Sequence, residues 1–172
     1  INGEVQRGRL VPFQTLHRNQ STLRHMFIHE EIDRRLKLAM DGDNQDDMRF
    51  GALQRVMEDY TTGKLITVAH QPYGKKKTAM WAKTSPAADE IWDIRVVDPS
   101  ASLRVLGGFA AMDVFVALEW EFRENLDNGL NMPLWNKFIR RAKTKWETCL
   151  PNYVRLSGGK TSDYISKNTT DV

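Results

Sequence analysis

The sequence has a single cysteine, Cys149, among 172 residues. An intramolecular disulfide is therefore excluded, and one isolated thiol is typical of a protein kept in a reducing compartment. No apolar run approaches the roughly 18 residues that a membrane-spanning helix needs, and residues 1–10 lack the apolar core of a signal peptide. Internal repeats and low-complexity tracts are absent as well. These absences predict a cytoplasmic protein that does not use a membrane.

What is present is the composition of an ordinary folded domain. Hydrophobic residues make up 41% of the chain and charged residues 27%, which is enough apolar material to bury a core. We expect a single domain over residues 1–150. Residues 151–172 have little hydrophobicity beyond Tyr164 and Ile165, which predicts an irregular C-terminal tail.

Charge is distributed unevenly, although the net charge is only +3. Residues 63–87 contain five lysines and no acid, and residues 134–160 contain seven basic residues and one acid. Two basic blocks favour a polyanionic partner such as nucleic acid, while solvated surfaces alone would give the same pattern. The candidate nucleic-acid contacts are Lys75, Lys76, Lys83, Arg140, Arg141 and Lys145.

Apolar positions at intervals of three and four residues predict three helices. Residues 21–40 and 46–60 would form the first two, joined by a polar connector into a helical hairpin. The third helix would run over residues 132–146, with Pro133 in its first turn and a basic outer face.

Three consecutive strands are predicted between these helices. The runs are rich in β-branched, aromatic and aliphatic residues, and they cover residues 91–97, 103–106 and 113–118. The first ends at the turn signal Asp98-Pro99-Ser100, and the second stops at Gly107-Gly108. Short connections imply an antiparallel meander. The predicted fold is therefore α+β: an N-terminal helical hairpin packed on a small antiparallel meander, with a C-terminal amphipathic helix.

Each predicted strand is associated with one arginine, and the three are Arg95, Arg104 and Arg123. The order helix, helix, basic loop, arginine-bearing meander, helix resembles the RelE/ParE superfamily of bacterial toxin components, which includes HigB and phage-derived relatives. The resemblance spans about residues 21–125. It is carried by Ile94-Arg95, Leu103-Arg104-Val105, and Val114-Phe115-Val116 followed by Glu121-Phe122-Arg123. The tyrosine that follows the last strand in this family has no counterpart here.

The resemblance implies a toxin component that acts on RNA or the ribosome, either as a metal-independent endoribonuclease or without catalysis. It also implies an antitoxin protein as partner, and no metal or other cofactor. The implied catalytic residues are Arg95, Arg123 and Lys77, by their positions relative to the family's strands. Guanidinium groups suit the task because they donate two hydrogen bonds to a phosphate and keep their charge. Fixed cations also stabilise the charge that develops at phosphorus.

A second interpretation is a non-enzymatic module, phage-encoded for example, that binds protein or nucleic acid and whose arginines are structural. Arginines on half-exposed strands commonly pair with nearby acids, and Asp93, Glu119 and Glu121 are available. Arg104 alternates in phase with Leu106, which predicts an architectural position. Both interpretations remain open for Arg95, whereas pairing is favoured for Arg123.

Overall fold

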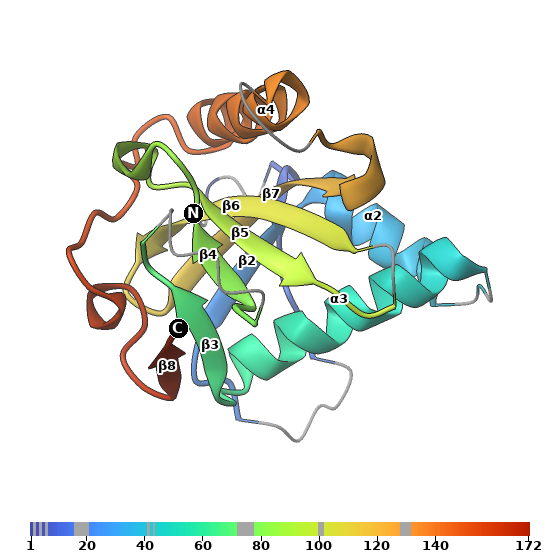
Figure 1. The fold of residues 1–172 in the computed structure, drawn as a ribbon, viewed down its shortest axis with the longest axis horizontal. Coiled ribbons are helices and arrows are strands. Elements are labelled where there is room, and N and C mark those ends of the chain that lie inside the picture. The colour runs from blue at the N-terminus through green and yellow to red at the C-terminus, as the bar shows by residue number, and fades with distance from the viewer. Residues whose placement is uncertain are drawn as a thin grey trace.

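A computed structural model describes residues 1, 3, 5, 7–15, 21–40, 42, 44–71, 78–99, 102–127 and 132–172, which form a mixed sheet flanked by helices (Figure 1). The strands in this part of the chain are β1 (Leu10–Pro12), β2 (His25–His29), β3 (Ile66–Ala69), β4 (Trp81–Lys83), β5 (Trp92–Val96), β6 (Leu103–Ala111), β7 (Val114–Phe122) and β8 (Thr169–Asp171). Their order across the sheet is β1-β2-β7-β6-β5-β4-β3-β8.

The predicted antiparallel meander forms the centre of this sheet. β5 pairs with β6 and β6 pairs with β7, both antiparallel. β4 adds to the meander antiparallel to β5. The other pairings make the sheet mixed, because β2 runs parallel to β7, and β3 runs parallel to β4 and β8. The meander is thus the middle of a larger sheet.

The predicted fold class, with its N-terminal helical hairpin, is wrong. Residues 21–40 contain β2 followed by the helix α2 (Glu30–Ala39), and β1 precedes both. Within β2, Met26 and Ile28 are buried at alternate positions, as in a strand. The three apolar residues of β2, Met26 to Ile28, fit both periods, and the strand partner β7 lies far along the chain, so local periodicity did not reveal the pairing. The protein is a mixed α/β structure in which strands dominate.

The other two predicted helices are present. α3 (Gln45–Thr61) covers the predicted range 46–60 and is capped by the Asn44 side chain, which accepts a hydrogen bond from the Asp47 amide. α4 (Pro133–Cys149) begins at the predicted proline and runs three residues further than expected. No helix among the described residues combines the length and the apolar composition of a bilayer-crossing segment.

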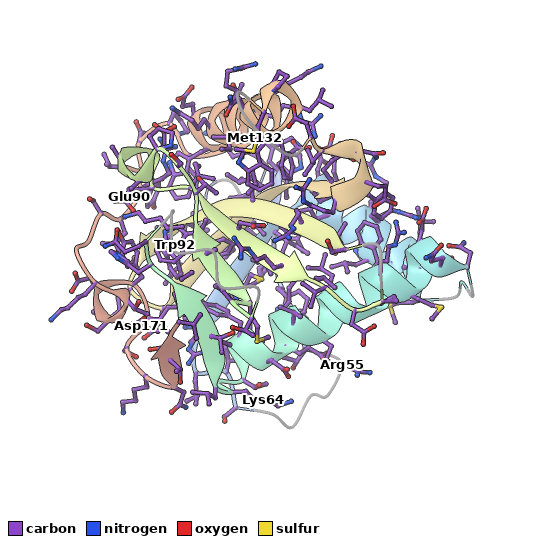
Figure 2. The ribbon with its side chains drawn as sticks, viewed as in Figure 1. Arg55, Lys64, Glu90, Trp92, Met132 and Asp171 are labelled. Carbon is purple, nitrogen blue, oxygen red and sulfur yellow. The ribbon has the colours of Figure 1, made fainter. Side chains whose placement is uncertain are left out.

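The helices cover opposite faces of the sheet. Along β6, Leu103 and Val105 belong to the same core cluster as Leu53 of α3, whereas Leu106 packs with Phe138 of α4. Figure 1 shows α4 on one side of the sheet and α3 on the other, and Figure 2 shows side chains filling the space between these layers. The sheet therefore has two faces on which a site could be built, one beneath α2 and α3 and one beneath α4.

The segment expected to be an irregular tail closes the fold. Much of residues 151–172 has irregular backbone, yet Tyr164 and Ile165 are buried in the main core cluster. β8 extends the edge of the sheet by pairing with β3. Arg24 donates from Nη2 to the carbonyl oxygens of Lys167 and Asn168, at 2.5 and 3.4 Å. This segment is part of the packed structure.

Candidate functional site

Two arginines and an aspartate meet on the face of the sheet that carries α4. Arg95 of β5 lies directly opposite Arg104 of β6, and Asp93 lies opposite Leu106, which packs against α4. Asp93 is 2% exposed, and its Oδ2 accepts hydrogen bonds from Arg95 Nε at 2.9 Å and from Arg104 Nη1 at 3.0 Å. Directly opposed like charges repel. The shared carboxylate is therefore what allows the two arginines to face each other.

Arg123 adds a third guanidinium to this cluster. It follows β7 directly, and its Nη1 donates to the carbonyl oxygens of Leu126 and Asp127, at 2.8 and 3.4 Å. Burial is the main cause that lowers the pKa of Arg123, and the positive charge of Arg104 lowers it further, while Asp93 opposes the shift. The structure thus brings the three predicted arginines together. We call Asp93, Arg95, Arg104 and Arg123 the arginine cluster.

The arginine cluster combines three guanidinium groups with the carboxylate of Asp93 at a partly open position, and Glu121 lies opposite Arg104 on the neighbouring strand. Within the described residues, Asp93 forms ion pairs with two of the three guanidinium groups, those of Arg95 and Arg104. The side chains of Arg95 and Arg104 are 24% and 15% exposed. Asp93 Oδ1 and Arg104 Nε are buried without a hydrogen-bond partner in that part of the chain. The exposed parts of Arg95 and Arg104 can bind an anion, because an oxyanion would accept charge-assisted hydrogen bonds there, whereas the buried Asp93 Oδ1 needs a donor.

Two acids that the sequence offered as partners of these arginines are bound elsewhere. Glu119 of β7 accepts ion pairs from Arg141 at 3.1 Å and from Lys145 at 2.9 Å, and Glu121 pairs with Arg141 at 3.3 Å. Lys145 also contacts Glu31 of α2. Two of the candidate nucleic-acid contacts, Arg141 and Lys145, are therefore turned toward the sheet and neutralised by carboxylates.

The remaining candidates lie in different environments. Arg140, on the same helix, is exposed to solvent. Lys83, at the end of β4, is buried. Lys75, Lys76 and Lys77 lie outside the described residues. The structure therefore groups Arg95 with Arg123, but it does not bring Lys83 or the arginines of α4 into the same cluster.

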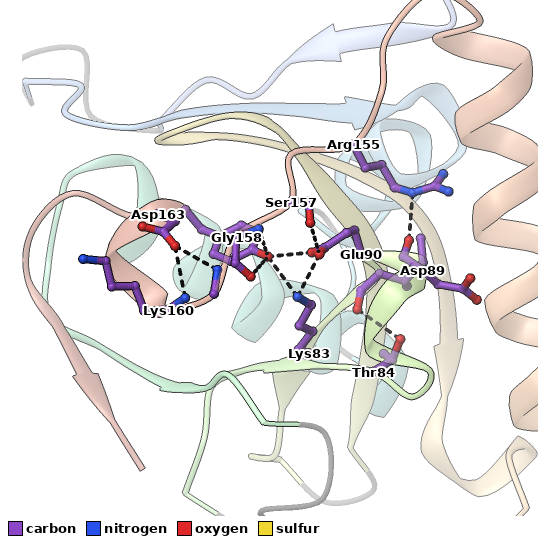
Figure 3. Close-up of polar contacts among 12 residues, drawn as sticks. Lys83, Thr84, Asp89, Glu90, Arg155, Ser157, Gly158, Lys160 and Asp163 are labelled. Atoms are coloured by element: carbon purple, nitrogen blue, oxygen red, sulfur yellow. Dashed lines mark hydrogen bonds and ion pairs between the residues drawn. The ribbon is translucent and has the colours of Figure 1, made fainter.

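Lys83 is the centre of a buried polar network (Figure 3). Its Nζ lies 2.9 Å from Glu90 Oε1 and 2.9 Å from the Tyr164 hydroxyl, which itself donates to Glu90 Oε2 at 2.7 Å. The Ser157 hydroxyl donates to Glu90 Oε1 at 2.9 Å. The Gly158 amide donates to the Tyr164 hydroxyl at 2.7 Å. The Lys83 and Glu90 side chains are 4% and 9% exposed, so a phosphate has almost no access to this ammonium group.

The pKa values indicate a structural role for this network. Burial lowers the pKa of Lys83, but hydrogen bonds to Tyr164 and Glu90 more than offset that effect, and the net pKa is raised. Burial raises the pKa of Tyr164. At neutral pH the lysine is then charged and the tyrosine neutral, so neither is activated as a base or nucleophile. The network clamps the C-terminal segment to β4.

Most of this network could not be found from the sequence. Glu90 and Tyr164 are 74 residues apart, and no short motif joins them. One signal was present: Lys83 ends the short apolar run that becomes β4, where a buried lysine requires a carboxylate or another strong partner. Glu90 also adopts a left-handed backbone conformation, with φ of 53°, which is uncommon for a residue with a side chain.

In comparisons with protein-family models, with curated proteins and with solved structures, no match to the chain was found. Function therefore has to be inferred from the residues and geometry of this chain. Within the described residues, no group of three histidine, cysteine, aspartate or glutamate side chains is placed to hold a metal ion.

Proposed function

We propose that the protein binds RNA through the arginine cluster, as a toxin component of the RelE/ParE type that acts on RNA or the ribosome. The observation that carries the proposal is the convergence of Arg95 and Arg104 on the buried carboxylate of Asp93, with the charge of Arg123 close by. Such a protein would act in the cytoplasm, where its substrate lies. It would also require an antitoxin protein to hold it inactive.

The chemistry of the site supports a phosphate ligand. Phosphate oxygens accept paired hydrogen bonds from guanidinium groups, and a partly buried position strengthens the attraction by excluding water. Arg95 and Arg104 would contact the phosphate. Arg123 has a different part, because its Nη1 is already held by backbone carbonyls after β7. It would orient the following loop and contribute its charge.

Cleavage of RNA would add a proton transfer to this binding site. Arginines can stabilise the charge that develops at phosphorus, but their pKa is too high for them to accept a proton at neutral pH. The group expected to move the proton is Lys77, whose position in the chain lies outside the described residues. Binding and cleavage are therefore separate steps of the proposal, and each has its own measurement.

The cellular test is inducible expression in bacteria. We expect the wild-type protein to arrest growth and accelerate messenger RNA decay, because the resemblance implies a toxin. Arg95→Ala should abolish the arrest. Arg55→Ala is the matched control: Arg55 projects outward from α3 (Figure 2), and its variant should arrest growth like the wild type. Absence of arrest by the wild type would contradict the toxin proposal.

The binding test uses single-stranded RNA with the purified protein. Each lost phosphate contact lowers the slope of log affinity against log salt by about 0.7 for a single strand. Arg95→Ala should show this change at every RNA sequence, and Arg55→Ala should not. Incubation of the same RNA with the wild type in EDTA then measures metal-independent cleavage. Binding that is unchanged by Arg95→Ala would remove Arg95 from the site.

The second candidate function is a non-enzymatic interaction module with structural arginines. It is favoured by the two hydrogen bonds that Asp93 accepts from Arg95 and Arg104. Under this alternative, Arg95→Ala lowers the free energy of unfolding and leaves any RNA binding and its salt dependence unchanged. Arg95→Ala therefore distinguishes the two candidates: it alters RNA binding under the first and the free energy of unfolding alone under the second.

A further inference from the structure

The edge of β7 is open over the last part of the strand. On one side β7 pairs with β6 along its whole length, from Val114 to Phe122. On the other side its pairing with β2 ends at Ala117, because the chain leaves β2 after His29 and enters α2. Within the described residues, 118–122 have no strand neighbour on that side.

Backbone donors of β7 point toward this open side. The Arg123 amide donates to Ser102 on the β6 side, at 2.7 Å. Amides alternate in direction along a strand, so those of Phe122 and Trp120 face away from β6. Consistent with this, the Phe122 amide donates to the side chain of Glu121 at 3.1 Å instead of to a strand. In the described residues this backbone donor is thus not paired with another strand.

The open edge lies at the floor of a groove. The groove has a volume of about 590 Å³ and is walled by α2 on one side and by α4 on the other. Glu119, Trp120 and Glu121 of β7 form its floor. Five residues of strand span roughly 17 Å, which matches a short extended peptide.

The charges in the groove restrict its occupant. The three carboxylates that line it, Glu31, Glu119 and Glu121, are each paired with Arg141 or Lys145 of α4. On the α2 wall, Arg34 forms no salt bridge within the described residues, and the side chain of Leu38, one turn later, is 63% exposed. The α2 wall therefore presents an exposed guanidinium, whose charge also acts on Glu31, beside one exposed apolar side chain.

We propose that this edge of β7 binds an extended segment of a partner protein by strand addition. The segment would contribute about five residues, hydrogen-bonded to the backbone of 118–122. Its side chains would alternate between the two walls. Those facing α2 would include an apolar residue against Leu38 and Trp120 and an acidic residue against Arg34. The site adjoins the arginine cluster, because Glu121 lies opposite Arg104, but the proposal does not depend on RNA binding.

A peptide suits the groove better than a nucleic acid does. A strand edge offers alternating amide donors and carbonyl acceptors, which a peptide backbone satisfies and a phosphate backbone does not. The acidic residue expected in the peptide follows from the position of Arg34, by charge complementarity.

The test is selection from a displayed library of random ten-residue peptides on the intact wild-type protein. Selected peptides should share alternating apolar residues and an acidic residue. The double variant Arg34→Glu with Leu38→Lys should weaken their binding by at least about tenfold, since removal of both a charge pair and an apolar contact costs more than about 1.4 kcal/mol. Arg55→Glu, with the same charge change on the outer side of α3, should leave binding within about twofold.

Hydrogen exchange locates the contact. A selected peptide should slow exchange of the amides of Trp120 and Phe122, and N-methylation of alternate peptide amides should abolish both binding and protection. The proposal is overturned if no peptide is enriched. It is also overturned if the double variant binds the selected peptides as well as the wild type does, or if the protected amides lie elsewhere. Equal weakening by Arg55→Glu would show a general charge effect and would overturn it too.

Discussion

Lys83 and Glu90 form an ion pair that is almost entirely removed from water. Removing two charges from water costs several kcal/mol per ion, and attraction repays this only when the remaining hydrogen-bonding groups are satisfied. Here Tyr164 and Ser157 supply those hydrogen bonds, from a segment far along the chain. The pair therefore depends on correct placement of the C-terminal segment. Loss of one partner leaves the other charge buried and uncompensated.

Lys83→Met should lower the free energy of unfolding by about 3–5 kcal/mol, because Glu90 remains buried without its partner. The double variant Lys83→Met with Glu90→Gln should lose less, since the uncompensated charge is gone. Lys137→Met, at an exposed lysine of α4, is the control and should change stability by no more than about 0.5 kcal/mol. Denaturant unfolding measures all three. A small loss for Lys83→Met alone would contradict the role assigned to the pair.

At the scale of elements, β6 and β7 form the longest pairing of the sheet, and a glycine allows it. The sequence predicted that the second strand stops at Gly107-Gly108, but β6 continues to Ala111. The register shifts between Leu106 and Gly107, where β7 carries one extra residue. A Cβ at position 107 would lie 2.0 Å from the Val116 carbonyl oxygen. Gly107 is thus a position within the strand where another part of the backbone approaches closely. In the sequence, such a glycine looks the same as one that marks a turn.

Gly107→Ala should destabilise the fold by about 1–3 kcal/mol, because backbone and the ring of Phe115 must move to accept the methyl group. Gly51→Ala is the matched control. Gly51 lies within α3, and a Cβ at this position would meet nothing within 4 Å. That variant should stabilise by about 0.5–1 kcal/mol. Thermal unfolding of both variants measures the difference, and equal effects would refute the close approach.

For the whole molecule, the response to alkaline pH depends on three groups that burial and hydrogen bonding keep protonated, Tyr60, Lys83 and Tyr164. Burial raises the pKa of Tyr164, and it raises the pKa of Tyr60 well above its usual value. Burial acts in the opposite direction on Lys83, but its hydrogen bonds to Tyr164 and Glu90 outweigh that effect, so the pKa of Lys83 is raised as well. All three groups therefore keep their protons in the folded state at pH values where the unfolded chain has begun to lose them.

The free energy of unfolding should fall as pH rises above about 10, the unfolded pKa of tyrosine and lysine. Below that pH these groups make their full contribution to the free energy of unfolding. Above it, each group that stays protonated only in the folded state lowers the free energy of unfolding by up to about 1.4 kcal/mol per pH unit. Denaturant unfolding between about pH 7 and 11 measures the decline. Tyr164→Phe should make the decline shallower, whereas Tyr153→Phe, at a well-exposed tyrosine, should not. An unchanged slope for Tyr164→Phe would show that the decline has another origin.

The parts of the fold that were predictable from sequence are those with a local physical cause. Alternating side chains bounded by turn residues indicate a strand whichever strand it pairs with. The meander of β5, β6 and β7 is present as predicted. The helices α3 and α4 follow in the same way from their apolar periodicity. The prediction of an N-terminal hairpin failed because β2 is defined by its parallel partner β7, whose identity no local pattern carries.

The sequence by itself determined that Arg95 and Arg104 lie on neighbouring strands and that Arg123 follows the next strand, since alternation and strand order follow from local patterns. Tertiary structure alone decided what each charge contacts. Asp93, not Glu119 or Glu121, holds the strand arginines, because the side chains of α4 occupy both glutamates. It also decided that Lys83 is buried. Distant segments bring the partners that make a buried charge stable, and composition does not say which segments will meet.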